Sequence, residues 1–185
     1  TVVTDRHEIA NVCGMEGVRY MHEAGEDLPM RQLIDVPSCV PAVPGLENAG
    51  AEFFAKEIEE LASMDRVIGL AEVMDFLAVI HGEDRMMDII DVMDKKGLYL
   101  QGHAPSVSGR MLSAYLCGGP NTCHESRERN EALEKLRSGM YVDARESSIT
   151  KNVEEIYEGV KGVKFYDHFC LCTDDREVDD IDRKS

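Results

Sequence analysis

The sequence predicts an α/β fold in which parallel strands alternate with helices. Apolar segments of strand length and amphipathic segments of helix length take turns from Thr1 to Thr173, as they do in proteins with crossover helices. Polar side chains suited to metal binding follow four of the strands. A doubly wound sheet gathers its site at one switch point, whereas a barrel draws on many strand ends, so we expect a (β/α)8 TIM-type barrel. Only seven strands are recognised, and the barrel is therefore expected to be incomplete.

The strand segments are apolar and end at glycine, proline or polar residues. In order, we expect them at residues 1–4, 32–36, 66–71, 98–101, 120–123, 140–144 and within 165–173. The helix segments show apolar residues three and four apart. In order, we expect helices at residues 14–24, 52–64, 83–96, 108–116 and 127–138, and a further helical stripe from 149 to 160. Residues 5–8 are expected to form a turn after the first strand.

Three helical stripes predict which side chains enter the core. The stripes are Phe54, Ile58 and Leu61; Met86, Ile90 and Met93; and Ile149, Val153, Ile156 and Val160. The ten methionines could suggest a cofactor-binding surface, but their helical spacing makes them core residues.

The composition limits which partners and which cellular location can be expected for the protein. The 185 residues carry a formal net charge of −16, which disfavours nucleic acid and anionic membrane surfaces as partners. No apolar run approaches the roughly 20 residues of a membrane span, and no signal-peptide pattern is seen. The six cysteines form no CxxC pair, so we expect reduced thiols and a cytoplasmic location. The chain starts in mid-strand without methionine, and we expect it to be a piece of a longer protein.

Two histidines and two carboxylates follow strands in equivalent ways. His103 comes after the strand at 98–101 and a glycine, and His124 comes after the strand at 120–123. Glu72 follows the strand at 66–71, and Asp174 follows the last strand. Because the carboxyl ends of parallel strands share one rim, these four side chains are expected to converge there. Such a mixed nitrogen and oxygen set suits Zn, Mn or Fe.

Several motifs, taken together and in order, resemble the bacterial and archaeal adenine deaminase family of the amidohydrolase superfamily. The resemblance covers essentially the whole chain. The motifs are TVVTDRHEIANV at 1–12, LAEVM at 70–74, GHAP at 102–105, HES at 124–126, GMY at 139–141 with RES at 145–147, and LCTDD at 171–175.

The resemblance implies a metal-dependent hydrolase that deaminates adenine to hypoxanthine and ammonia in purine salvage. It implies a binuclear centre, with Mn or Fe preferred to Zn, in which Glu72 bridges the two metals. His103 and His124 would be further ligands, and Asp174 would bind metal and shuttle a proton. Glu125 is a candidate acid for the ring nitrogen, although a carboxylate at a helix start is an equal alternative.

Four further residues are weaker candidates from position alone. Ser38 and Cys39 follow the strand at 32–36 and could line a purine pocket or simply pack a loop. His7 and Glu8 would lie beside the first strand of the barrel. The purine base itself would be a small-molecule partner.

Two departures from the family pattern bear on activity. The paired histidines (His-x-His) of the first strand have no counterpart, and Arg6 stands where the family is expected to have proline. We therefore expect residues 1–185 to be a single partial barrel domain that is inactive alone and associates into a homo-oligomer through open strand edges. Alternatives are another amidohydrolase acting on a purine or cyclic amide, or an inactive folded fragment.

Overall fold

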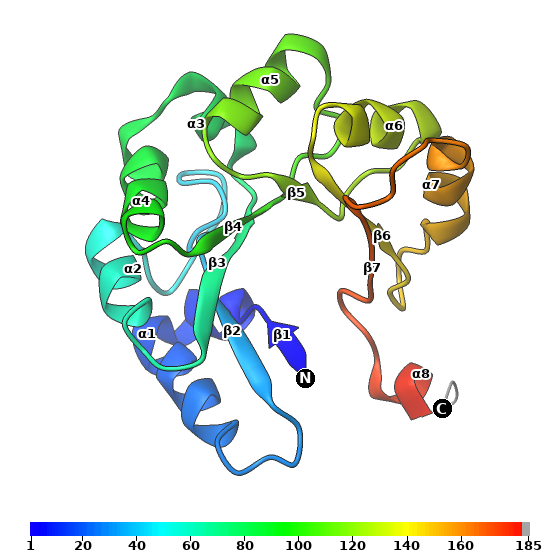
Figure 1. Cartoon of the computed structure of the whole chain (residues 1–185). Helices are drawn as coiled ribbons and strands as arrows, with labels where there is room; N and C mark the ends of the chain where they lie inside the picture. Colours follow the sequence, from blue (N-terminus) through cyan, green and yellow to red (C-terminus); the bar gives the residue numbers. More distant parts are fainter. Residues whose placement is uncertain (183–185) are drawn as a thin grey trace. The chain divides into compact units, whose positions relative to one another are not determined.

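The computed structural model describes residues 1–182 and confirms an α/β fold with parallel strands (Figure 1). Within these residues the strands are β1 (Val2–Thr4), β2 (Gln32–Val36), β3 (Val67–Val73), β4 (Tyr99–Gly102), β5 (Thr122–Cys123), β6 (Tyr141–Arg145) and β7 (Phe169–Cys172). The helices are α1 (His7–Ala24), α2 (Ala55–Leu61), α3 (Phe76–His81), α4 (Asp84–Lys95), α5 (Gly109–Cys117), α6 (Arg129–Arg137), α7 (Val153–Val160) and α8 (Val178–Asp182). All seven expected strands are present.

The chain divides into two compact units. Unit 1 comprises residues 1–102 with 117–120, and unit 2 comprises residues 103–116 with the chain from 121 onward. Each unit has its own parallel sheet, with strand order β1-β2-β3-β4 in unit 1 and β5-β6-β7 in unit 2. In both sheets, consecutive strands along the chain are parallel neighbours, as is usual for sequential strands.

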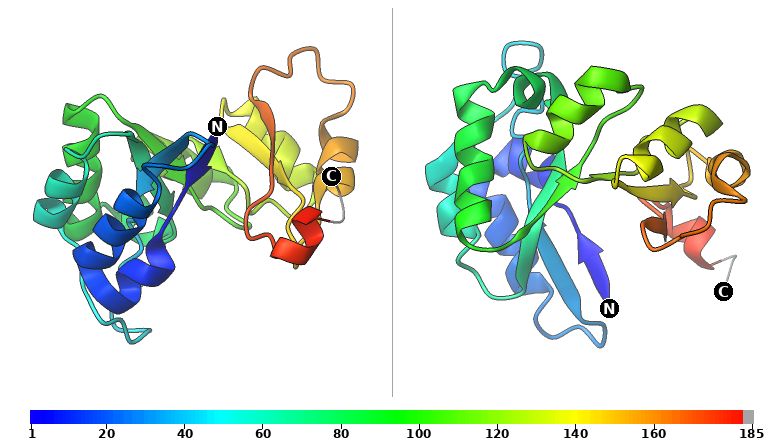
Figure 2. Two further views of the ribbon diagram at one scale, coloured as in Figure 1. Left: turned by 90° about the horizontal axis from the view of Figure 1, so that it is seen from below. Right: turned by 45° about the horizontal axis from the view of Figure 1, so that its top comes forward.

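The core of unit 1 lies between its sheet and its helices. Helix α2 packs beside α4, and α4 lies against β3 and β4 (Figure 2). The predicted core residues Ile58, Leu61, Met86 and Met93 are all buried. Phe54 is different, because it precedes α2 and its side chain is 49% exposed, so its assignment to the helical stripe was wrong.

Two helices of unit 1 differ from expectation. Helix α1 begins at His7, where a turn was expected, and is interrupted at Gly14, whose φ of 64° and ψ of −148° are not helical. Glycine tolerates this conformation because it has no Cβ. The sequence pattern captured only the part after this break. The short helix α3 was not anticipated; Asp75 caps it by accepting a hydrogen bond from the Ala78 amide at 3.2 Å.

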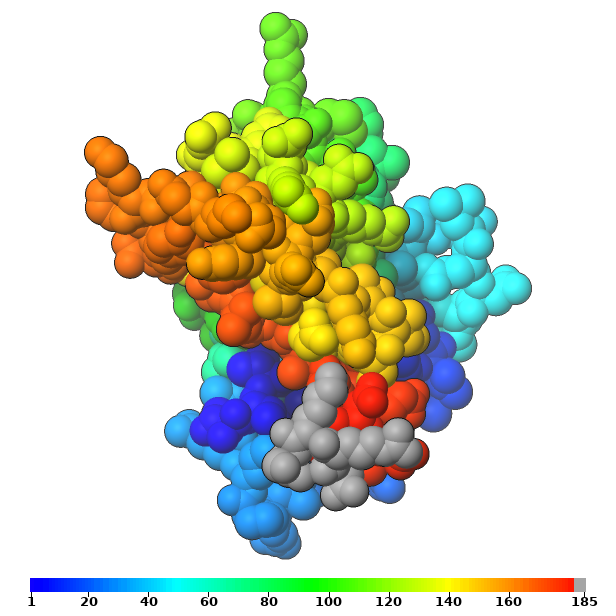
Figure 3. Space-filling model, turned by 90° about the vertical axis from the view of Figure 1, so that its right-hand side faces the viewer, coloured from blue at the N-terminus to red at the C-terminus, as the bar shows by residue number. Residues whose placement is uncertain are grey.

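Unit 2 is built on a small apolar cluster between its sheet, α6 and α7. Its buried members are Ala132, Val142, Ala144, Ile156 and Val160. Ile149 lies before α7 and is 86% exposed, so the expected stripe begins only at Val153. The segment between α7 and β7, coloured orange, lies at the surface in Figure 3.

The described helices were compared with the length and apolarity that a membrane span requires. None of those within residues 1–182 is both long enough and apolar enough to serve as a transmembrane span.

Candidate active site

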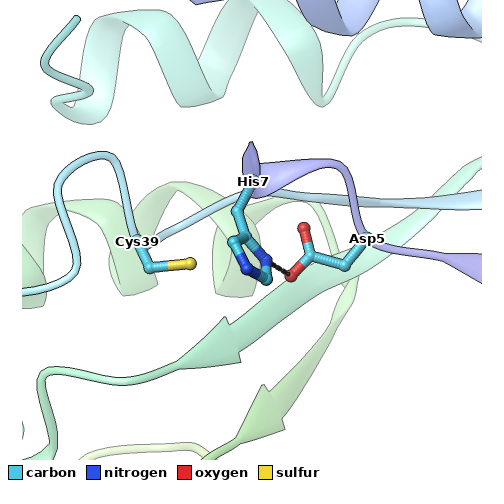
Figure 4. Close-up of side chains that lie close together, drawn as sticks. All are labelled: Asp5, His7 and Cys39. Carbon is cyan, nitrogen blue, oxygen red and sulfur yellow. Dashed lines mark hydrogen bonds and ion pairs between the residues drawn. The ribbon is translucent and has the colours of Figure 1, made fainter. Parts of the chain in front are cut away.

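Three side chains of unit 1 meet beyond the carboxyl ends of its first three strands. Asp5 follows β1, Cys39 lies in the irregular segment after β2, and Glu72 occupies the end of β3. His7, the first residue of α1, lies among them. Its Nδ1 is 2.6 Å from Asp5 Oδ2 and 3.7 Å from Glu72 Oε1 (Figure 4 shows Asp5, His7 and Cys39). The sequence thus predicted the strand-end position of Glu72 but missed Asp5.

The charge on His7 follows from these neighbours. Burial alone would lower the pKa of its imidazole, but hydrogen bonding to Asp5 and Cys39 outweighs burial and raises the pKa to about 12. Glu8, which is exposed, adds a carboxylate oxygen 3.3 Å from His7 Nε2. His7 is therefore an imidazolium surrounded by acidic groups.

The loop after β2 is held rigidly beside this histidine. The buried Ser38 hydroxyl donates a hydrogen bond to the Glu72 carbonyl oxygen at 2.7 Å. Cys39 is 1% exposed, and burial raises the pKa of its thiol to about 11. The Asn11 side-chain amide donates to the carbonyl oxygens of His7 at 2.9 Å and Cys39 at 2.8 Å. The predicted substrate contacts of Ser38 and Cys39 remain predictions.

A buried acid that the sequence analysis missed lies in the sheet of unit 1. Asp35 on β2 is 3% exposed, and the Tyr99 hydroxyl donates to both of its carboxylate oxygens at 2.8 Å. Asp35, Gly69 and Tyr99 are partners in register across β2, β3 and β4. The Tyr99 ring therefore crosses β3 over a glycine. Burial raises the pKa of Asp35 to about 7, although the Tyr99 hydrogen bond opposes this shift.

The two predicted histidine ligands lie together in unit 2. The rings of His103 and His124 pack edge to face, with centroids 5.4 Å apart. The His103 amide donates to the Tyr115 hydroxyl at 3.0 Å, which fixes the chain after β4. His124, Glu125 and Asp174 each offer a ligand atom, and these atoms all lie within 4.8 Å of one another.

Arg145, the last residue of β6, joins the two carboxylates of this group. Its side chain is buried, and its Nη1 contacts both Glu125 Oε1 and Asp174 Oδ2. Burial opposes the charge on Arg145, but the Glu125 and Asp174 carboxylates raise its pKa. No role was predicted for Arg145 from the sequence. Its strand-end position, which it shares with the predicted ligands, was the signal that could have identified it.

A fully buried lysine supports the loops that carry both histidines. Lys135 Nζ donates to the Ala104 carbonyl oxygen at 2.6 Å and to the Ser126 hydroxyl at 3.2 Å, and it pairs with Glu131 at 2.6 Å. Ala104 follows His103, and Ser126 lies two residues beyond His124. Lys135 is thus a positioning residue for the chain on which both imidazoles are mounted.

Comparison with known proteins adds independent information. The chain is 40% identical over 181 residues to adenine deaminase of Clostridium acetobutylicum and 42% identical over 182 residues to adenine deaminase of Dehalococcoides mccartyi. It is also 42% identical over 181 residues to adenine deaminase 2 of Carboxydothermus hydrogenoformans. The chain resembles adenine deaminases over nearly its whole length.

These alignments include 98% of this chain but only 31% of each relative. The chain thus spans about a third of the length of the curated relatives it matches. No family model matches it. The resemblance to adenine deaminases that the motifs indicated is therefore confirmed as sequence similarity over this third.

Proposed function

We propose that the chain is part of an adenine deaminase, which converts adenine and water to hypoxanthine and ammonia in purine salvage. The observation that carries the proposal is an identity of about 40% to proteins of that name over 98% of the chain. It is supported by the polar side chains that gather at the strand ends within each unit. On this proposal, residues 1–185 form one partial domain of a cytoplasmic (β/α)8 barrel enzyme.

The donor atoms at these strand ends fit a divalent metal. Imidazole nitrogens and carboxylate oxygens are ligands that suit Mn, Fe and Zn. In unit 2, His124, Glu125 and Asp174 already bring three such atoms within 4.8 Å of one another. We propose that Glu72, His103, His124 and Asp174 hold a binuclear centre, with Mn or Fe in preference to Zn. When bound, such a metal lowers the pKa of a water to about 7.

Two acidic residues of the chain, Asp174 and Glu125, are proposed to carry out the proton transfers of hydrolysis. Asp174 accepts the proton of the attacking water and delivers it to the departing amine, a role for a carboxylate that is partly exposed. Glu125 donates a proton to the ring nitrogen of the purine and takes one back from the C6 hydroxyl as ammonia leaves. Arg145, which contacts both acids, holds them in fixed orientation. Ser38 and Cys39 are proposed to bound the purine pocket, with His7 and Glu8 close by.

A substitution of Asp174 tests this function. In a full-length protein that contains this chain, Asp174→Asn is expected to abolish ammonia release from adenine while metal content is mostly kept, because an amide can coordinate weakly but cannot accept a proton. Ammonia release and metal analysis are the two measurements. Asp179→Asn, which removes the same charge from an exposed residue of α8, is the matched control and is expected to change neither.

Other results would contradict the proposal. A fully metal-loaded wild-type protein that releases no ammonia from adenine, but does so from guanine or cytosine or hydrolyses hydantoin, would indicate another amidohydrolase. Because this chain has no His-x-His, we expect the 185-residue chain alone to be inactive and to bind fewer than two metals.

A further inference from the structure

Asp5, His7 and Cys39 form a cluster that the proposed adenine deaminase ligands do not include. Each side chain offers one ligand atom, and these atoms all lie within 4.8 Å of one another. Figure 4 shows the Cys39 sulfur and the Asp5 carboxylate on either side of the His7 ring. Asp5 and His7 follow β1 and Cys39 follows β2, and these two strands are neighbours in the sheet of unit 1.

The cluster is incompletely satisfied in its hydrogen bonding. Among the described residues, Asp5 Oδ1 is buried and has no hydrogen-bond partner. Its other oxygen, Oδ2, is bonded to His7 at 2.6 Å. Asn11, which holds the carbonyl oxygens of His7 and Cys39, also leaves its own Oδ1 buried without a partner. Buried polar atoms normally find partners, so a carboxylate oxygen left over beside an imidazole and a thiol indicates a place for a cation.

We propose that Asp5, His7 and Cys39 bind a divalent cation of the Zn²⁺ class. Sulfur, nitrogen and oxygen donors together are typical of Zn²⁺ sites, and three protein ligands leave a fourth position open. On binding, the Cys39 thiol and the His7 imidazolium each release one proton to solvent, and the Cys39 sulfur and a His7 ring nitrogen then bind the metal. The Asp5 oxygen that lacks a partner gains the cation as its neighbour. The site does not depend on the proposed deaminase activity.

Cobalt binding to the 185-residue chain tests the site, because a thiolate bound to Co²⁺ gives a charge-transfer absorption that nitrogen and oxygen ligands do not. We expect a saturable band that reaches one Co²⁺ per chain and is displaced by Zn²⁺. Cys39→Ser is expected to remove the band. Cys13→Ser, which changes an exposed cysteine, is the matched control and is expected to keep it.

Two further variants separate this site from the proposed catalytic centre. His7→Gln is expected to weaken Co²⁺ binding by more than the roughly 10–100-fold that loss of an outer-shell partner alone can cost. Glu72→Gln, which alters a proposed catalytic ligand, is expected to leave the thiolate band in place. If Cys39→Ser fails to fold, which circular dichroism reports, His7→Gln decides the outcome.

A wild-type chain without a thiolate band would overturn the inference, as would a band that survives Cys39→Ser. Either result would mean that Cys39 is not a ligand of a bound metal. Because the readout is an absorption of the isolated chain, its failure is distinct from a failure to release ammonia in the full-length protein.

Discussion

Arg6 is a buried cation with too few partners. It is 2% exposed, and its Nη1 donates to the Val18 carbonyl oxygen at 3.3 Å. Its Nε and Nη2 are buried and have no hydrogen-bond partner among the described residues. Burial lowers the pKa of Arg6 to about 10, and the nearby Arg66 adds to the effect. The backbone φ of −135° at this residue also differs from the value of about −65° that proline, expected by resemblance, would require.

We therefore expect Arg6→Met to stabilise the chain. The substitution keeps the apolar stem and removes two unsatisfied donors, each of which costs about 1–3 kcal/mol when left buried without a partner. Urea unfolding should show a higher midpoint for Arg6→Met. Arg137→Met, at an exposed residue of α6, should change the free energy of unfolding by no more than about 0.5 kcal/mol. Equal or lower stability of Arg6→Met would mean that the guanidinium has partners in solution.

Asp35 makes the stability of unit 1 depend on pH. Its pKa rises from 3.8 to about 7 on folding, so the folded chain binds the proton more tightly than the unfolded chain. This contribution to stability is fully present below pH 3.8 and is lost as the pH rises through 7, at a slope of about 1.4 kcal/mol per pH unit at most.

Asp35→Asn should remove this component. The amide oxygen still accepts the Tyr99 hydroxyl, but the side chain no longer titrates. We expect the free energy of unfolding to fall less between pH 4 and pH 7 in Asp35→Asn than in the wild type. Asp94→Asn, at an exposed residue of α4, should keep the wild-type dependence. Parallel curves for Asp35→Asn and the wild type would place the titration elsewhere.

At the scale of elements, Gly69 on β3 leaves room for the Tyr99 side chain of β4 to reach Asp35 on β2. A Cβ added to Gly69 on β3 would lie 2.8 Å from the Tyr99 ring. Any larger residue therefore moves the ring away from Asp35 and breaks its two hydrogen bonds.

Gly69→Ala is expected to destabilise the chain by about 1–3 kcal/mol, the usual cost of overpacking. Urea unfolding measures the loss. In a Tyr99→Ala background the ring is gone, so the same substitution should cost much less. A cost that is equal in both backgrounds would exclude the ring as its cause.

Local pattern predicted the strands well and the helix starts less well. The strands could be recognised because their apolar runs are short and end at glycine, proline or polar residues. Helix α1 escaped full recognition because Gly14 joins two helical segments with one non-helical residue, which no periodicity reveals. Ile149 has the spacing of the α7 stripe, yet Ser147 accepts hydrogen bonds from the Ile149 and Thr150 amides and holds a turn there instead.

Part of the candidate site could be predicted from the sequence in the same way, from the positions where strands end. The positions of His103, His124 and Asp174 after β4, β5 and β7 were predicted correctly, because position along a parallel strand can be read from sequence. Asp35 and Arg145 were missed because their roles depend on partners far away along the chain. Tyr99 is 64 residues from Asp35, and Asp174 is 29 residues from Arg145.

At the scale of the whole molecule, each sheet ends in strands that lack a neighbour on one side. Within the described residues, β1 and β7 are edge strands of their sheets. Leu171 on β7 is 69% exposed, and it lines an apolar pocket of about 390 Å³ with Val153 and Cys172. Exposed edges with apolar side chains are prone to pair with other chains.

We therefore expect the 185-residue chain to self-associate, and Leu171→Lys to reduce this association. Charge on an edge strand opposes pairing, since a second chain would have to bury it. Sedimentation velocity over a range of concentrations measures the effect. Val178→Lys, at an exposed residue of α8, is the control and should not reduce association. A wild-type chain that stays monomeric at high concentration would contradict the expectation.

Asn152 ties together parts of unit 2 that are distant in sequence. Its Oδ1 accepts the Arg145 amide at 2.7 Å, its Nδ2 donates to the Ser126 carbonyl oxygen at 2.9 Å, and its own carbonyl oxygen accepts the Ile156 amide at 2.9 Å. The ends of β5 and β6 and the first turn of α7 are thus fastened at one residue. We therefore expect amide hydrogen exchange at these residues to report one cooperative opening, and not separate fraying of each element.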